Sequence, residues 1–219
     1  MINYYHPRVL SGYLILFIIL TMKSPSFLDK FTKTPILFWQ PSRNFFSHFA
    51  STASGRRLLL VSNYIIWLFF FYLSFLLVKV NPNNFWQIFL AVLTSEIIEK
   101  YLKIKCLWRR PLCRQINQLP RGFLRSWYQN CSFPSGHTIK AAFFLLFILQ
   151  YGVFSPWLFL FFTAPLLIFR ILTGFHYPAD VFGGTIFGII IWFVVKGLQF
   201  PPFLLNFTRI IFNTIFLIH

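Results

Sequence analysis

Long apolar segments limit this chain to one kind of solvent and one main class of fold. Residues 58–80 are apolar over a length that spans a bilayer, since a transmembrane helix needs about 20 mainly apolar residues. Only 11% of all residues are charged, whereas about 25% are charged in a typical soluble domain. The hydrophobic fraction of 57% also exceeds what one small core can bury. We therefore expect an integral membrane protein.

Turn residues divide the apolar sequence into six expected membrane spans. These are 9–22, 58–80, 85–102, 138–154, 156–172 and 181–198. The sequence Asn-Pro-Asn-Asn at 81–84 separates two of them, which predicts a helical hairpin. No small-residue cleavage site follows 9–22, so we expect this segment to stay in the membrane. The fold class expected is all-α, an integral membrane bundle of about six transmembrane helices in a single domain, 1–219.

Two further segments lie outside these spans. The connector 23–57 is basic and partly aromatic, which is typical of an interfacial amphipathic helix. The tail 203–219 is apolar with Arg209 within it. This tail either lies in the membrane interface or enters the bilayer.

The charge of the chain is strongly positive, with 20 Lys and Arg residues against four acidic residues and a net charge of +16. Such a charge suits a nucleic acid, an anionic membrane surface or an anionic substrate. The basic residues lie between apolar segments, and no nucleic-acid-binding motif is present. We therefore expect most of them to contact acidic lipid head groups, and we expect no nucleic-acid partner.

The three cysteines, Cys106, Cys113 and Cys131, lie in the polar stretch between two spans. Their spacing matches no CxxC metal or redox pattern. A disulfide between two of them requires that this stretch lies outside the cytoplasm.

Four charged residues lie near the end of the 85–102 span. Glu96 and Lys100 are four residues apart, as are Glu99 and Lys103, and this spacing allows ion pairs along one helix face. Buried charge in a membrane helix often indicates function. Charges so close to a helix end are also typical of an interfacial ion cluster, which is the interpretation we favour.

The first of three polar clusters runs from Lys103 to Arg110 and Pro111. Lys103 and Arg110 are seven residues apart, so they share one face if the helix continues past the bilayer. Pro111 then ends the helix, because a proline disfavours helical geometry at the residue before it. Basic residues just beyond a span are usually head-group anchors, so this cluster alone is weak evidence of a site.

The second cluster is Pro134, Ser135, Gly136 and His137, directly before an apolar helix. Ser135 suits the N-cap position, and Gly136 allows a ligand to approach the backbone closely. Exposed N–H groups at a helix start favour an anion. By itself the pattern fits an ordinary helix cap beside an interfacial histidine equally well.

The third cluster contains Arg170, His176 and Asp180. Pro178 suits the first helical position of the last span, which places Asp180 in the first turn, near His176. A carboxylate on one imidazole nitrogen fixes the tautomer and leaves the other nitrogen able to attack. The alternative is a capping acid beside a histidine with an ordinary structural role.

The order of the spans brings the three clusters to one membrane face. The first cluster ends one span and the second begins the next, so both lie on the same side. The chain then crosses away from His137 and returns at Arg170. We therefore expect one polar site at a single membrane face.

Together these motifs resemble those of the type 2 phosphatidic acid phosphatase superfamily. The pattern is Lys-x6-Arg-Pro, then Pro-Ser-Gly-His, then Arg-x5-His-x3-Asp, in this order and at helix ends, over residues 103–180. The superfamily includes bacterial lipid phosphate phosphatases, and vanadium haloperoxidases are its soluble relatives. Phe169 stands where the superfamily usually has a serine, which puts one hydroxyl contact to phosphate in question.

The resemblance implies a phosphatase that acts on a membrane lipid phosphate or diphosphate, with no metal and no cofactor. In the implied reaction His176 attacks phosphorus to give a phosphohistidine, and Asp180 orients His176. His137 protonates the leaving oxygen and then activates water. The residues implied to bind the phosphate are Lys103, Arg110, Ser135, Gly136 and Arg170.

Other functions stay open at this point. A phosphotransferase of the same superfamily would pass phosphate to an acceptor other than water. A non-catalytic binding or transport protein would keep the site without turnover. Candidate substrates are undecaprenyl diphosphate, phosphatidic acid, phosphatidylglycerophosphate and a lipid A phosphate. The sequence does not predict an oligomeric state.

Two indications disagree about which membrane face carries the site. The resemblance implies an active site on the extracytoplasmic face. The positive-inside rule instead favours the cytoplasm for this face, which carries Arg109, Arg114, Arg121 and Arg125 as well as the basic connector. We expect the extracytoplasmic face.

Overall fold

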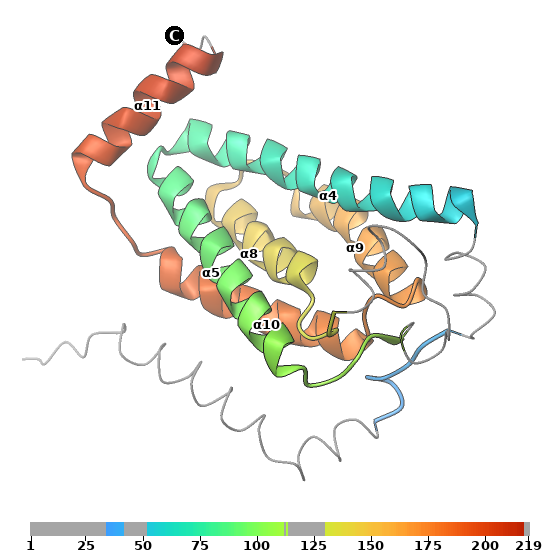
Figure 1. Ribbon diagram of the computed structural model, residues 1–219. Helices are drawn as coiled ribbons and strands as arrows, with labels where there is room; N and C mark the ends of the chain where they lie inside the picture. Colours follow the sequence, from blue (N-terminus) through green and yellow to red (C-terminus); the bar gives the residue numbers. More distant parts are fainter. Residues whose placement is uncertain (1–33, 42–51, 112, 114–129, 217–219) are drawn as a thin grey trace, which may run out of the picture. The chain divides into compact units, whose positions relative to one another are not determined.

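Figure 1 shows the chain as a computed structural model that describes residues 34–41, 52–111, 113 and 130–216. The chain divides into two units, Met1–Trp39 and Gln40–His219. In the first unit, residues 35–38 form a turn. The expected span 9–22 and most of the connector 23–57 lie outside the described residues. The sixth span and the single domain over 1–219 therefore stay predictions.

The described part of the second unit is built from helices. They are α4 (Ala53–Val80), α5 (Asn83–Lys105), α8 (Gly136–Tyr151), α9 (Pro156–Leu172), α10 (Pro178–Val195) and α11 (Pro202–Phe216) (Figure 1). The first five correspond to the spans expected between 58 and 198, with ends that differ by a few residues at most. The apolar tail forms α11. The all-α fold class is confirmed.

Local sequence sets where several of these helices begin and end. Thr52 caps α4 by accepting a hydrogen bond from the Gly55 N–H at 3.1 Å, and Ser155 caps α9 in the same way. Pro178 is the first residue of α10, as expected. Gly152 ends α8 with a φ of 63°, a conformation that glycine adopts at little cost.

Helix α8 lies at the centre of the second unit, because it contacts α4, α5, α9 and α10. Glycine permits its close contact with α10: a Cβ atom at Gly188 would collide with the Ile139 carbonyl and the Ala142 methyl group. Small residues let helix backbones approach in this way in membrane proteins. Helix α9 runs back between α8 and α10, so α8 and α10 run in the same direction. Their first turns lie side by side.

The outer surface of the second unit is strongly apolar. Leu68 and Phe71 of α4 are 68% and 70% exposed. Helices α4 and α10 are long and apolar enough to cross a membrane, and α8 and α9 are apolar but shorter. Soluble proteins rarely expose large continuous apolar patches. Lipid rather than water suits this surface.

The hairpin expected at 81–84 connects α4 to α5 and is tied to the end of α10. The Asn84 amide donates to the Leu77 carbonyl at 2.8 Å. The amides of Asn83 and Gln87 both donate to the Leu198 carbonyl at 2.9 Å. The NH2 groups of these three amides thus find backbone partners, whereas the side-chain oxygens of Asn84 and Gln87 are buried without a hydrogen bond.

We expect Gly188→Ala to lower the melting temperature of the purified protein in detergent, because the added methyl group has no space against α8. Overpacking of this kind commonly costs about 1–3 kcal/mol. Gly197→Ala is the matched control, since a Cβ atom there meets nothing within 4 Å. Equal melting temperatures for the two variants would contradict this description of the α8–α10 contact.

Candidate active site

The three sequence clusters meet at one end of the second unit. Lys103 and Arg170 lie in the last turns of α5 and α9, and His176 lies in the loop before α10. Ser135 precedes α8, and Asp180 lies in the first turn of α10. The Ser135 N–H donates to the Asp180 carbonyl at 3.2 Å, which joins these two helix starts. Two helix starts and two helix ends therefore surround one site.

The carboxylate of Asp180 is fully buried and held from several sides. Its Oδ1 accepts a hydrogen bond from Trp108 Nε1 at 2.8 Å. Its Oδ2 accepts from the Tyr177 N–H at 2.7 Å and from the Ser132 hydroxyl. A buried carboxylate requires such donors in place of water. The same Oδ2 lies 3.4 Å from Nδ1 of His176, so the carboxylate faces one imidazole nitrogen.

The sequence motifs do not predict the contacts of Trp108 and Ser132 with Asp180. Trp108 lies inside the first cluster and Ser132 just before the second, but neither residue type indicates a partner in α10. The partners are 72 and 48 residues away in sequence. No local pattern could have identified them.

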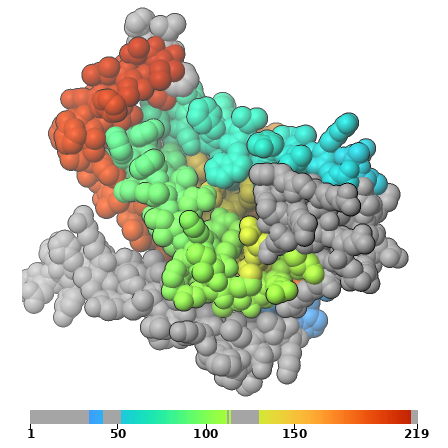
Figure 2. Space-filling model, in the orientation of Figure 1, coloured from blue at the N-terminus to red at the C-terminus, as the bar shows by residue number. Residues whose placement is uncertain are grey.

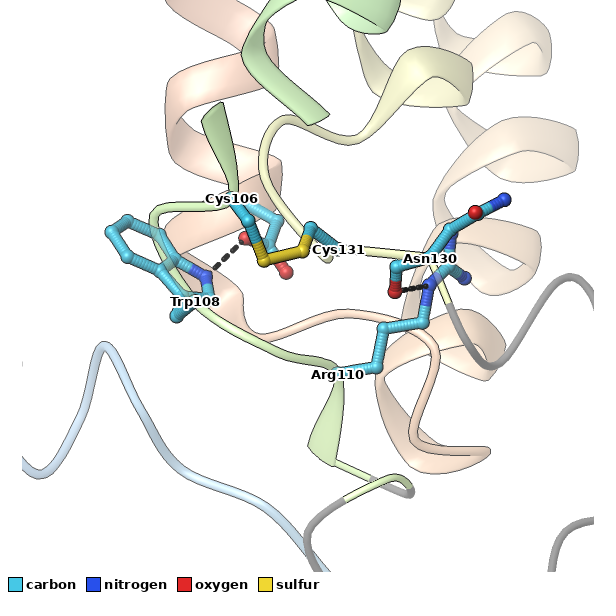
Figure 3. The surroundings of a disulfide bond; sticks show 6 residues. Cys106, Trp108, Arg110, Asn130 and Cys131 are labelled. Carbon is cyan, nitrogen blue, oxygen red and sulfur yellow. Dashed lines mark hydrogen bonds between the residues drawn. A yellow bond between two sulfur atoms is a disulfide. The ribbon is translucent and has the colours of Figure 1, made fainter. Parts of the chain in front are cut away.

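The helix does not continue from Lys103 to Arg110, so the condition under which these two residues would share one helical face is not met. Helix α5 ends at Lys105, and Cys106 takes a left-handed conformation with a φ of 47°. Cys106 forms a disulfide with Cys131, which ties the end of α5 to the segment before α8 (Figure 3). Arg110 therefore reaches the site from a connecting segment rather than from a helix.

Two guanidinium groups lie over the ring of Phe175, another residue that the motifs do not predict. The Cζ atoms of Arg110 and Arg170 are 5.5 and 5.2 Å from the ring centroid. Arg110 Nε donates to the Asn130 carbonyl at 3.2 Å (Figure 3), and Arg170 Nη1 donates to Asn63 Oδ1 at 3.2 Å. These contacts gather two cations that can each bind a phosphate through paired hydrogen bonds.

The start of α8 has the features expected of an anion-binding helix end. Ser135 is the N-cap residue, but its hydroxyl accepts from the Thr138 hydroxyl at 2.9 Å and makes no cap hydrogen bond. His137 follows in the first turn, with the Trp67 ring 6.1 Å away. Ser135 and Gly136 are buried, and His137 is only partly exposed. In Figure 2 a small yellow patch lies beside α5 in green. The partial positive charge of a helix N-terminus favours a negatively charged ligand.

The ion pairs expected along α5 are formed only in part. Glu99 pairs with Lys103, as predicted. The predicted pairing of Glu96 with Lys100 is wrong. Glu96 pairs instead with Lys140 of α8, with its Oε1 2.7 Å from the lysine Nζ. Lys140 is buried and needs a counter-charge, whereas Lys100 is exposed. The i to i+4 rule considers a single helix and does not include such a competitor.

Residues 84–202, more than half of the chain, match the sequence model of the PAP2 superfamily. The chain belongs to the PAP2 superfamily. Among solved structures it is similar to the transmembrane PAP2 type phosphatidylglycerolphosphate phosphatase from Bacillus subtilis. That similarity has 21% sequence identity and a TM-score of 0.42, and it covers 87% of this chain and 94% of that chain. No curated protein matches the chain.

One departure from the PAP2 pattern lies in α9. The carbonyl of Phe169 accepts hydrogen bonds from the N–H and the hydroxyl of Thr173, at 2.9 and 2.7 Å. The phenyl ring of Phe169 provides no hydroxyl for a phosphate. The nearby cations and the start of α8 stay the predicted anion-binding groups of this PAP2 member.

The surroundings of His176 favour a neutral imidazole. Burial, and then the positive charges of Arg110 and Arg170, hold the pKa of His176 well below its ordinary value. A neutral imidazole has a lone pair with which to attack an electrophile. Because Nδ1 faces Asp180, the attacking atom would be Nε2.

The lowered pKa of His176 predicts how activity depends on pH. A histidine that serves as nucleophile attacks only when neutral, so with His176 in that predicted role kcat/KM should fall as the pH drops through a pKa that lies below 6.5. Arg110→Gln removes one positive charge and should move this acid limb to higher pH. Arg109→Gln, at an exposed neighbouring position, is the control and should leave the limb in place. An acid limb above pH 6.5 in the unaltered protein would contradict the prediction.

Proposed function

We propose that this protein is a metal-independent phosphatase that removes phosphate from a membrane lipid through a phosphohistidine intermediate. One observation carries the proposal: buried Asp180 faces one nitrogen of His176, beside the guanidinium groups of Arg110 and Arg170. A nucleophile, an orienting acid and the charges that stabilise a phosphoryl group are gathered at one place. Membership of the PAP2 superfamily supports a phosphatase.

In the first step Nε2 of His176 attacks phosphorus in line with the leaving lipid oxygen. A P–N bond forms as the P–O bond to the lipid breaks, and His137 donates a proton to the departing oxygen. Asp180 stabilises the positive charge that develops on the imidazole. The negative charge on the non-bridging oxygens is balanced by the groups proposed to bind phosphate, which are Lys103, Arg110, Arg170, Ser135 and the Gly136 N–H.

In the second step water attacks the phosphohistidine. His137, now neutral, accepts a proton from this water, a P–O bond forms, and the P–N bond to His176 breaks. Inorganic phosphate leaves, and both histidines return to their starting states. The cations supply the charge stabilisation that a divalent metal supplies in other phosphatases, so we propose that none is required.

The apolar exterior supports a lipid as the carrier of the phosphate. Exposed side chains such as Leu68 and Phe71 suit a protein that lies in a bilayer. A substrate embedded in the same bilayer would present its phosphate at the membrane face, where the helix ends gather the site. The candidates are phosphatidylglycerophosphate, phosphatidic acid, undecaprenyl diphosphate and a lipid A phosphate.

We expect His176→Ala to abolish phosphate release, with a loss of about 10⁴-fold or more, because it removes the nucleophile. The measurement is phosphate release by purified protein across the candidate lipid phosphates in detergent, with a soluble sugar phosphate for comparison. Lys105→Gln, which removes an exposed lysine at the end of α5, is the control. Release by His176→Ala at the rate of the unaltered protein would refute the proposed nucleophile.

The disulfide supports an extracytoplasmic site. Cys106 and Cys131 join the end of α5 to the segment that leads into α8, directly at the proposed site. Disulfides persist in oxidising compartments and are rare in the cytosol. This outweighs the positive-inside rule here, because two of the basic residues on this face, Lys103 and Arg110, are assigned to phosphate. The residues Arg114, Arg121 and Arg125 lie outside the described part of the chain.

We expect a membrane-impermeant maleimide to label Cys113 in intact cells, because Cys113 belongs to the segment between α5 and α8. Burial raises the pKa of this thiol, so labelling should be run at mildly alkaline pH and for an extended time. Cys113→Ser is the control for background labelling. Labelling that occurs only after the cells are permeabilised would place the site in the cytoplasm instead.

A further inference from the structure

Lys140 is a buried cation that the proposed reaction does not use. It lies in α8, one turn after Gly136, and its side chain is only 2% exposed. A buried ammonium group is unfavourable unless it is paired. Its Nζ lies 2.7 Å from Glu96 Oε1 and 3.8 Å from Glu99 Oε2, and it donates to the Gly136 carbonyl at 3.4 Å. The Trp67 ring covers it, with the centroid 5.1 Å away.

Glu99 connects this buried cation to the proposed phosphate site. One carboxylate oxygen pairs with Lys103 on the next turn of α5, and the other faces Lys140 of α8. The same carboxylate lies against Gly136, where an added Cβ atom would collide with it. Glu99 therefore lies between a proposed phosphate-binding lysine and the helix start proposed to bind the same anion.

We propose that Glu99 is a positioning residue of the phosphate site, which holds Lys103 beside the start of α8 and is itself held by Lys140. This inference rests on the proposed function. A lysine has a long flexible stem, so an ammonium group without a fixed partner samples many positions. Pairing with Glu99 would preorganise the ammonium group before substrate arrives, which is how charges contribute most to catalysis.

Lys140 explains how a carboxylate can be tolerated next to an anion site. Glu99 alone would repel a phosphate, but Lys103 and Lys140 together exceed its negative charge. Glu96, which also pairs with Lys140, is 54% exposed, so solvent screens it. The Trp67 ring lies next to both Lys140 and His137, so the charge network and the proposed acid and base share one neighbour.

The test compares Glu99→Gln, Glu99→Asp, Lys140→Met and the double variant Glu99→Gln/Lys140→Met. Each is measured for kcat, for KM, for inhibition by orthovanadate and for melting temperature with and without orthovanadate. Lys105→Gln is the matched control, since this lysine of α5 lies over the Tyr101 ring and outside the network.

We expect Glu99→Gln to lower kcat/KM by about 10- to 100-fold, mainly through kcat, because a shift of about 1 Å in a positioned group has effects of this size. Inhibition by orthovanadate should weaken in parallel, and Glu99→Asp should recover part of both. The double variant removes both buried charges, so its melting temperature should be higher than that of either single variant. Its kcat should stay as low as that of Glu99→Gln. A merely structural role would instead restore kcat together with the melting temperature.

Three results would overturn the inference: an unchanged kcat/KM in Glu99→Gln, tighter inhibition by orthovanadate in that variant, or recovery of kcat in the double variant. Failure of the proposed function is a separate outcome, in which the unaltered protein releases no phosphate from any lipid phosphate. In that case the rise in melting temperature on adding orthovanadate, compared between the unaltered protein and Glu99→Gln, still tests the role of Glu99. The unaltered protein should be stabilised, and an equal stabilisation of Glu99→Gln would count against positioning.

Discussion

The site depends first on the burial of the Asp180 carboxylate. A carboxylate without water must be surrounded by donors, and here they come from Trp108, Ser132 and the Tyr177 N–H. These donors belong to the segment after α5, the segment before α8 and the start of α10. Satisfying one carboxylate therefore fixes the relative positions of three segments that the apolar packing of helices alone would leave undetermined. Nδ1 of His176 lies 3.4 Å from Oδ2 of the same carboxylate.

A second constraint is the gathering of positive charge around one aromatic ring. Arg110 and Arg170 approach Phe175 from different segments. Arg110 also donates a hydrogen bond to the Asn130 carbonyl, and Arg170 donates one to the Asn63 side chain. Two nearby guanidinium groups repel each other, so the fold must hold them in place by such contacts. Burial, and then these positive charges, hold the pKa of His176 well below its ordinary value, and the same charges would favour an anion at the proposed site.

The sequence predicts those parts of this structure that depend on local chemistry. Helix α9 begins at Pro156 and α10 at Pro178, because proline and capping residues act on their own backbone. It does not predict that α5 stops at Lys105, since that end coincides with a disulfide to Cys131 across 25 residues. Nor does it predict the pairing of Glu96 with another helix. Contacts between distant segments follow from packing, which no spacing rule contains.

The directions of the four helices explain why an anion site can form where they meet. Helices α8 and α10 point their N-termini at the site, and the partial positive charge of a helix start favours a phosphate. Helices α5 and α9 bring C-termini with partial negative charge. Each of these two carries a cation in its last turn, Lys103 or Arg170, which offsets that charge. The order of the spans decides which helix ends meet, and the basic residues at two of those ends add positive charge where they meet.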